Sequence, residues 1–183
     1  MSAAPPVLPD QALRRVLAIA RADGWSVVLI AALGGLVTVV QGAWIETAAA
    51  GLVVLAGLGE LHGHRRLLRR DAQGLGWMIA AQLFLLAVIW AYAWWRWRYF
   101  DPAGLWAELP GLVRTELDRQ LLIAGLDPEL DRPFLLQLVN RLTCFVLAVV
   151  SAVYQGGLAA YYALQGNRVR QALAAPPPPS PPL

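Results

Sequence analysis

Long stretches without a charged residue dominate the pattern of polar and apolar positions along this chain. Three of them cover residues 24–45, 72–95 and 142–167. Each is longer than the roughly 20 residues that an α-helix needs to cross a bilayer. A fourth apolar stretch, 47–59, is shorter and lies between two glutamates. The pattern therefore predicts three membrane-spanning helices, and the fourth stretch needs a separate argument.

The distribution of arginine supplies that argument, because short cytoplasmic loops collect Lys and Arg. If 43–61 also crosses, both termini and the loop 62–72 lie on one side, with nine of the fifteen basic residues, all of them arginine. The segment 96–132 lies on the other side, where acidic residues outnumber arginines. With three spans, the basic N-terminus and the arginines of 65–70 would fall on opposite sides. We therefore predict four spans with both termini cytoplasmic.

The predicted fold is an all-α integral membrane protein, in which four transmembrane helices form two antiparallel hairpins within a domain covering 24–170. An external helical segment, 96–132, joins helices 3 and 4, with a helix expected over 105–124. The remaining boundaries are a disordered N-terminus at 1–9, a cytoplasmic amphipathic helix at 10–23, spans at about 24–41, 43–61, 74–95 and 142–164, and a proline-rich disordered tail at 171–183.

Composition supports a membrane protein, since 58% of the residues are apolar and 15% are charged, against roughly 45–50% and about 25% in soluble domains. The absence of lysine and the abundance of alanine, leucine and arginine are typical of a GC-rich bacterial genome. We therefore predict the bacterial inner membrane. A cleavable signal is the alternative for the N-terminal region, but Arg21 and Asp23 interrupt it before the apolar run begins, so we expect it to be retained.

The stretch "WAYAWWRWRYF", residues 90–100, contains seven aromatic side chains and two arginines. Such a mixture can bind nucleic acid, but the segment that follows is acidic, so we expect no nucleic-acid partner. Aromatic rings and arginines also gather where a span leaves the bilayer. The residues predicted to contact lipid headgroups are Trp94, Trp95 and Trp97 on this side and Arg65, Arg66, Arg69 and Arg70 of "RRLLRR" on the other.

A polar stripe on the fourth span is the strongest candidate for a functional feature. Its residues are spaced three, four or seven positions apart and therefore share one helical face. Gln82, near the middle of the third span, is the expected hydrogen-bonding partner of this stripe, so the candidate set is Gln82, Arg141, Cys144, Ser151 and Gln155. A neighbouring series of small residues, Ala152, Gly156 and Ala160, would let another helix approach closely.

Two interpretations of the stripe remain. Polar and small residues can simply hold membrane helices together through packing and hydrogen bonds. A permeation or ligand site would instead need ionisable groups within the membrane. Among the stripe residues only Arg141 approaches that requirement, so packing is favoured.

Other chemistry finds little support in the sequence. Glu60 and His64 share a helical face, but His62 points away, which leaves two metal ligands where a site needs three or four. The single cysteine, Cys144, lies far along the chain from both histidines, and no nucleophile or phosphate-binding motif is present. We expect no metal, no cofactor and no enzymatic activity.

The function predicted from these features is that of a small, non-catalytic multi-pass protein that assembles with itself or serves as an accessory subunit of a membrane complex. Its expected partners are the lipid bilayer and either a second copy or another membrane protein. A small transporter or channel component that uses the polar stripe is the first alternative. A membrane-embedded enzyme is the second.

Overall fold

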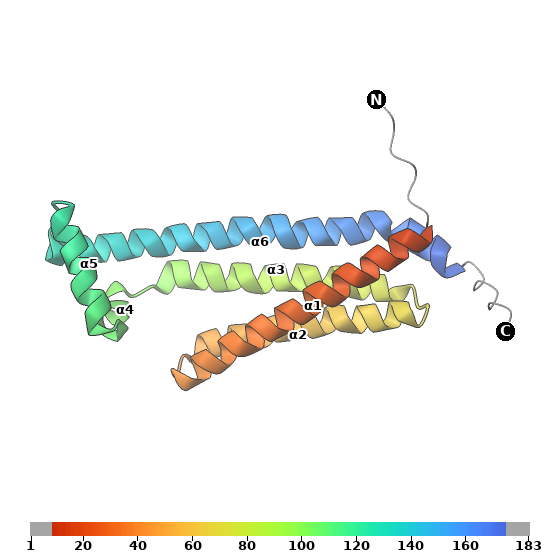
Figure 1. The fold of residues 1–183 in the computed structure, drawn as a ribbon, viewed down its shortest axis with the longest axis horizontal. Helices are drawn as coiled ribbons and strands as arrows, with labels where there is room; N and C mark the ends of the chain where they lie inside the picture. Colours follow the sequence, from red (N-terminus) through yellow and green to blue (C-terminus); the bar gives the residue numbers. More distant parts are fainter. Residues whose placement is uncertain (1–8, 175–183) are drawn as a thin grey trace, which may run out of the picture. The chain divides into compact units, whose positions relative to one another are not determined.

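The computed structural model describes residues 9–174, which form six α-helices and no strand. Four helices are long and apolar enough to cross a membrane, so the predicted all-α fold with four potential spans is confirmed. These four are α1 (Pro9–Val40), α2 (Trp44–Leu68), α3 (Gln73–Tyr99) and α6 (Pro128–Ala174), shown in Figure 1. The tail 171–183 and the N-terminal segment 1–9 lie largely outside the described residues.

The chain forms two compact units. Within the described residues, the first unit contains 9–88 and 151–174, and the second unit contains Ile89–Val150. α3 and α6 therefore each contribute one part to the first unit and another part to the second.

The predicted amphipathic helix 10–23 and the first span are one uninterrupted helix, α1, with no break between them. A tight turn joins α1 to α2. Gly42 takes a φ of +71° there, a conformation that glycine adopts without strain. The hydroxyls of Thr38 and Thr47 lie 2.9 Å apart across this turn, so a hydrogen bond links the two helix ends.

α2 runs seven residues beyond the predicted end of the second span, to Leu68, and a short turn then leads into α3. Asp71 organises this turn by accepting hydrogen bonds from the backbone N–H of Gln73 at 2.9 Å and from Nε of Arg66 at 2.7 Å. The Gln73 backbone N–H and, after it, the Arg66 guanidinium lower the pKa of the Asp71 carboxyl, because both stabilise its charged form.

Glycine lets α2 and α3 approach each other backbone to backbone. A Cβ added to Gly63 would lie 2.6 Å from the carbonyl oxygen of Gly74, and one added to Gly74 would lie 2.5 Å from the carbonyl oxygen of Gly63. Both positions are buried. This contact fixes the spacing of α2 and α3 in the part of the first unit next to the Asp71 turn.

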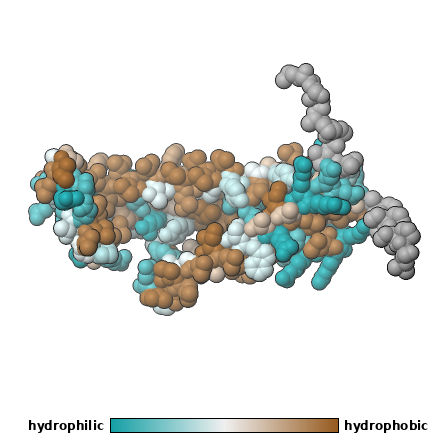
Figure 2. Space-filling model, viewed as in Figure 1, coloured by the Kyte–Doolittle hydropathy of each residue, from teal (hydrophilic) through white to brown (hydrophobic). Residues whose placement is uncertain are grey.

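The apolar core of the first unit lies around the fully buried ring of Tyr162. Its buried members are Val16, Ala20, Leu67, Leu75, Met78, Tyr162 and Val169. Many large apolar side chains remain exposed on the long helices, and Figure 2 shows them covering much of the visible surface. An apolar exterior of this kind suits a bilayer, where lipid replaces water as the solvent.

The segment between α3 and α6 forms two short helices, α4 (Pro102–Glu108) and α5 (Gly111–Ile123), so the prediction of one helix over 105–124 was wrong. Pro110 is the physical reason. The residue before a proline avoids the helical region, and Leu109 accordingly has an extended backbone with ψ of 139°. α6 also begins earlier than predicted, at Pro128, because the Asp127 carboxylate accepts a hydrogen bond from the N–H of Glu129 at 2.8 Å.

Candidate functional site

Two carboxylates are buried between the helices of the first unit. Asp23 on α1 is 6% exposed and Glu60 on α2 is 1% exposed. Glu60 precedes Arg65 by five residues, which corresponds to roughly 7–8 Å along a helix that rises about 1.5 Å per residue. Glu60 therefore lies inside its helix rather than at the arginine-rich end, whereas Asp23 follows Arg21 by two residues on α1.

Every oxygen of the two carboxylates accepts a hydrogen bond. Nε2 of Gln82, on α3, donates to Oδ2 of Asp23 at 2.8 Å and to Oε2 of Glu60 at 2.9 Å. The hydroxyl of Tyr154 donates to Oδ1 of Asp23 at 2.8 Å, and the hydroxyl of Tyr162 donates to Oε1 of Glu60 at 2.6 Å. We call these five residues, contributed by all four long helices, the acidic centre.

The electrostatics of the acidic centre are unusual because its donors are neutral. Among the described residues, no arginine or histidine forms a hydrogen bond or ion pair with either carboxylate. Two like charges without a counter-ion are costly in a low-dielectric interior, far more so than the hydrogen bonds of neutral donors can offset. The centre therefore favours a state in which a bound positive charge reduces the repulsion.

One polar atom of the acidic centre has no protein partner. Gln82 is 1% exposed, and its Oε1 accepts no hydrogen bond among the described residues. A buried acceptor that lacks a donor costs about 1–3 kcal/mol. This oxygen belongs to the same amide group whose nitrogen binds both carboxylates, so a ligand of the centre can also reach it.

The structure buries Gln82, Ser151 and Gln155 of the predicted stripe in the first unit. Gln82 was expected to bond to the stripe on α6, but its amide nitrogen binds the carboxylates of α1 and α2 instead. Gln155 lies on the buried face of α6, and its Oε1 also has no partner within the described chain. The buried face of α6 continues from Ser151 and Gln155 to Ala159 and Tyr162.

The predicted packing series lies at the flank of this face. Ala160 is exposed, and Ala152 and Gly156 are half-buried. A Cβ added at Gly156 would meet nothing within 4 Å. Within residues 9–174 the series therefore leaves room beside α6.

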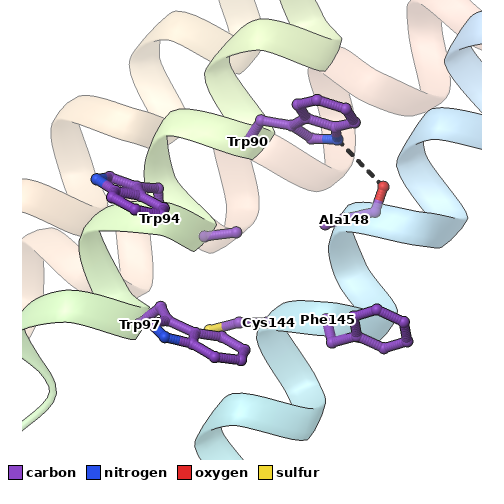
Figure 3. A pocket seen from close by; sticks show the side chains of 7 residues that line it. Trp90, Trp94, Trp97, Cys144, Phe145 and Ala148 are labelled. Carbon is purple, nitrogen blue, oxygen red and sulfur yellow. Dashed lines mark hydrogen bonds between the residues drawn. The ribbon is translucent and has the colours of Figure 1, made fainter.

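The remaining stripe residues, Arg141 and Cys144, belong to the second unit. Arg141 is exposed, with its guanidinium 5.8 Å from the centre of the Trp97 ring. Cys144 is buried beside an apolar groove of about 360 Å³ between α3 and α6, shown in Figure 3. Nε1 of Trp90 donates to the carbonyl oxygen of Ala148 at 3.1 Å and ties the two helices together there. The groove can hold apolar groups, and its lining contains no carboxylate, histidine or arginine side chain.

The predicted headgroup residues take several environments. Trp94 is 71% exposed, Trp97 is 44% exposed and Trp95 is half-buried. Arg65, Arg69 and Arg70 are exposed, whereas Arg66 forms an ion pair with Asp71. The sequence pattern missed Asn140, which is buried and accepts a hydrogen bond from Nε of Arg96 at 3.1 Å.

The carboxylate of Glu60 turns toward the acidic centre, and the His62 ring packs edge-on against the Trp77 ring at 5.1 Å between centroids. Within the described part of the chain, no three or more His, Cys, Asp or Glu side chains gather as a metal site would require. Comparison with known proteins adds no relative, since no family model, curated protein or solved structure matches this chain.

Proposed function

We propose that this protein is a small, non-catalytic membrane protein that acts as a transporter or channel component, with the acidic centre as its ion-binding site. The single observation that supports this proposal is the pair of buried carboxylates, Asp23 and Glu60, held by neutral donors between the long helices. Ionisable groups within a membrane domain are the feature that such a site needs. The polar stripe by itself offered only Arg141.

The proposed setting is the bacterial inner membrane, with both termini in the cytoplasm. Arginine supports this orientation, because the N-terminal region, the α2–α3 turn and the end of α6 carry most of the basic residues. In this orientation the acidic centre lies in the cytoplasmic half of the membrane. The exposed arginines of the α2–α3 turn would contact anionic headgroups, and the tryptophans near the end of α3 would lie at the opposite headgroup layer.

Reconstitution into vesicles tests the transport proposal. We expect vesicles that contain the protein to dissipate an imposed pH or cation gradient about tenfold faster than protein-free vesicles, since intramembrane carboxylates support ion relays. A pH-sensitive dye inside the vesicles, read in sodium, potassium and magnesium buffers, measures the flux. The double variant Asp23→Asn, Glu60→Gln should lose it.

The matched control is Glu108→Gln, which removes an exposed carboxylate outside the acidic centre and should leave the flux unchanged. Equal rates for the wild type and protein-free vesicles would contradict the transport proposal. Equal rates for the wild type and the double variant would show that any flux does not use the acidic centre.

Assembly is the second candidate function, and the open flank of α6 favours it. The helix presents Gly156 with free space beside it, next to Gln155, whose buried Oε1 has no partner in the described chain. Membrane helices associate through such small residues and through side-chain hydrogen bonds. A second copy of this chain, packed along Ala152, Gly156 and Ala160, would fill the space.

The assembly candidate predicts that Gly156→Leu reduces the dimer fraction in native mass spectrometry by about tenfold, because a bulky side chain blocks close helix approach. Gly157→Leu is the matched control, since its Cβ also meets nothing within 4 Å but points away from that flank. Because both sites are open, neither substitution strains the single chain. A strictly monomeric wild type would rule this candidate out.

A further inference from the structure

We propose that the ligand of the acidic centre is a single proton, shared between the carboxyl groups of Asp23 and Glu60. The identification of the proton as the transported ion rests on the proposed function. Proton binding itself depends only on the geometry of the acidic centre. One amide nitrogen donates to an oxygen of each carboxylate. Because both oxygens accept from the same nitrogen, the distance between them cannot exceed the sum of the two hydrogen-bond lengths. The two carboxylates are therefore direct neighbours.

The repulsion between two such neighbours explains why the centre binds a proton. Two carboxylates that share a site cannot both stay ionised without a positive charge beside them. The hydroxyls of Tyr154 and Tyr162 and the amide of Gln82 are neutral donors. A proton on one carboxyl group removes the repulsion and leaves one negative charge, which the neutral donors can stabilise.

The hydrogen-bond pattern favours a proton over a metal ion. All four carboxylate oxygens already face an N–H or O–H group, and the hydrogens of the Gln82 amide point into the space between the carboxylates. A divalent cation in that space would be repelled by those hydrogens and would find only these two carboxylates as anionic ligands in residues 9–174. A proton needs neither a vacant coordination sphere nor a third ligand.

The unpartnered oxygen of Gln82 would allow the centre to accept a further proton. In the singly protonated pair, Nε2 of Gln82 donates to the carboxylate oxygens. If a second proton binds, both carboxyl groups can donate, and a half-turn of the amide would bring the buried Oε1 into position to accept from them. The same side chain can therefore bond to the carboxyl pair in both protonation states.

Other titratable groups stand close to the pair in the chain. Asp23 follows Arg21 by two residues on α1, and His64 lies one turn beyond Glu60 on α2. α3 contributes the neutral Gln82, and α6 contributes Tyr154 and Tyr162, which need their protons to donate. The carboxyl pair is thus the part of the centre that can exchange a proton without losing its other hydrogen bonds.

Infrared spectroscopy of the purified protein in lipid nanodiscs, with a chelator present, tests this inference. We expect the carbonyl band of one protonated carboxylic acid per chain at neutral pH, shifted in D₂O. Raising the pH should remove the band and release one proton, a measurement that needs no variant. Asp23→Asn and Glu60→Gln should each remove the band at neutral pH, because the remaining carboxylate keeps its donors and loses its charged neighbour.

The control is Glu108→Gln, which should keep the band. A wild type without the band, or one that releases a bound divalent cation to the chelator, would overturn the inference. A band that persists in Asp23→Asn would also overturn it, because the proton would then belong to one carboxyl group alone. If the band is present and vesicle flux is absent, the proton site stands and the transport function fails. Flux without the band would support the transport function and overturn the proton site.

Discussion

Replacing Gln82 with leucine should destabilise the folded protein by about 3–5 kcal/mol, the cost of losing two hydrogen bonds to a buried charged pair. Nε2 of Gln82 holds one oxygen of Asp23 and one of Glu60, so its loss leaves both buried oxygens without a donor. Leucine has nearly the volume of glutamine, so no large cavity contributes to the effect. Reversible unfolding in mixed detergent micelles, followed by circular dichroism, measures the free-energy change.

The double variant Asp23→Asn, Glu60→Gln provides the control for this prediction. In that background the carboxylates have become neutral amides, and Gln82→Leu should cost only about 1–2 kcal/mol, typical of interhelix hydrogen bonds in membranes. The difference between the two costs measures the coupling of Gln82 to the charge of the pair. Equal costs in the two backgrounds would show that Gln82 acts through packing alone.

The four long apolar helices could be predicted from sequence because a bilayer imposes a simple condition on length and charge. Charge-free stretches long enough to cross a bilayer stand out, and α1, α2, α3 and α6 contain the predicted spans. The ends were less predictable. α2 continues past Glu60 to Leu68 because no proline interrupts it there, although the side chains become polar. Pro110 was a visible breaker, and its effect on the external segment was missed.

The acidic centre could not be predicted from the same pattern. A search for charge-free runs treats every acidic residue as the end of a run, so Asp23 was interpreted as an interruption and Glu60 as the boundary of the apolar stretch 47–59. The contacts that give these carboxylates their role are distant in sequence, since Tyr154 lies 131 residues from Asp23 and Tyr162 lies 102 residues from Glu60. Gln82 was identified as a buried polar residue, but its partners come from two other helices.

The close approach of α2 and α3 connects the fold to the acidic centre. Gly63 lies three residues after Glu60 on α2, and Gly74 lies eight residues before Gln82 on α3. Because each glycine stands against the carbonyl oxygen of the other, the two backbones set the distance between the helices that carry Glu60 and Gln82. A bulkier residue at either glycine must therefore disturb the hydrogen bond from Gln82 to Glu60 as well as the packing.

We expect Gly74→Ala to destabilise the protein by roughly 2–3 kcal/mol, in the range of overpacked cores. Its Cβ would lie 2.5 Å from the carbonyl oxygen of Gly63 and 2.8 Å from the backbone nitrogen of Leu67, and backbone atoms cannot move aside as a flexible side chain can. Unfolding in mixed micelles gives the stability. The infrared carboxyl band should shift at the same time, because Glu60 and Gln82 move apart.

Gly76→Ala is the matched control, two residues farther along the same helix. Gly76 is exposed, and a Cβ there would meet nothing within 4 Å. Alanine is the better helix former by about 1 kcal/mol, so this variant should keep or slightly raise the stability and leave the carboxyl band in place. Two substitutions of the same type on one helix should thus act in opposite directions. Equal destabilisation by both would show that the contact between Gly63 and Gly74 is not what makes alanine unfavourable in this part of α3, because the Cβ at position 76 meets no neighbour.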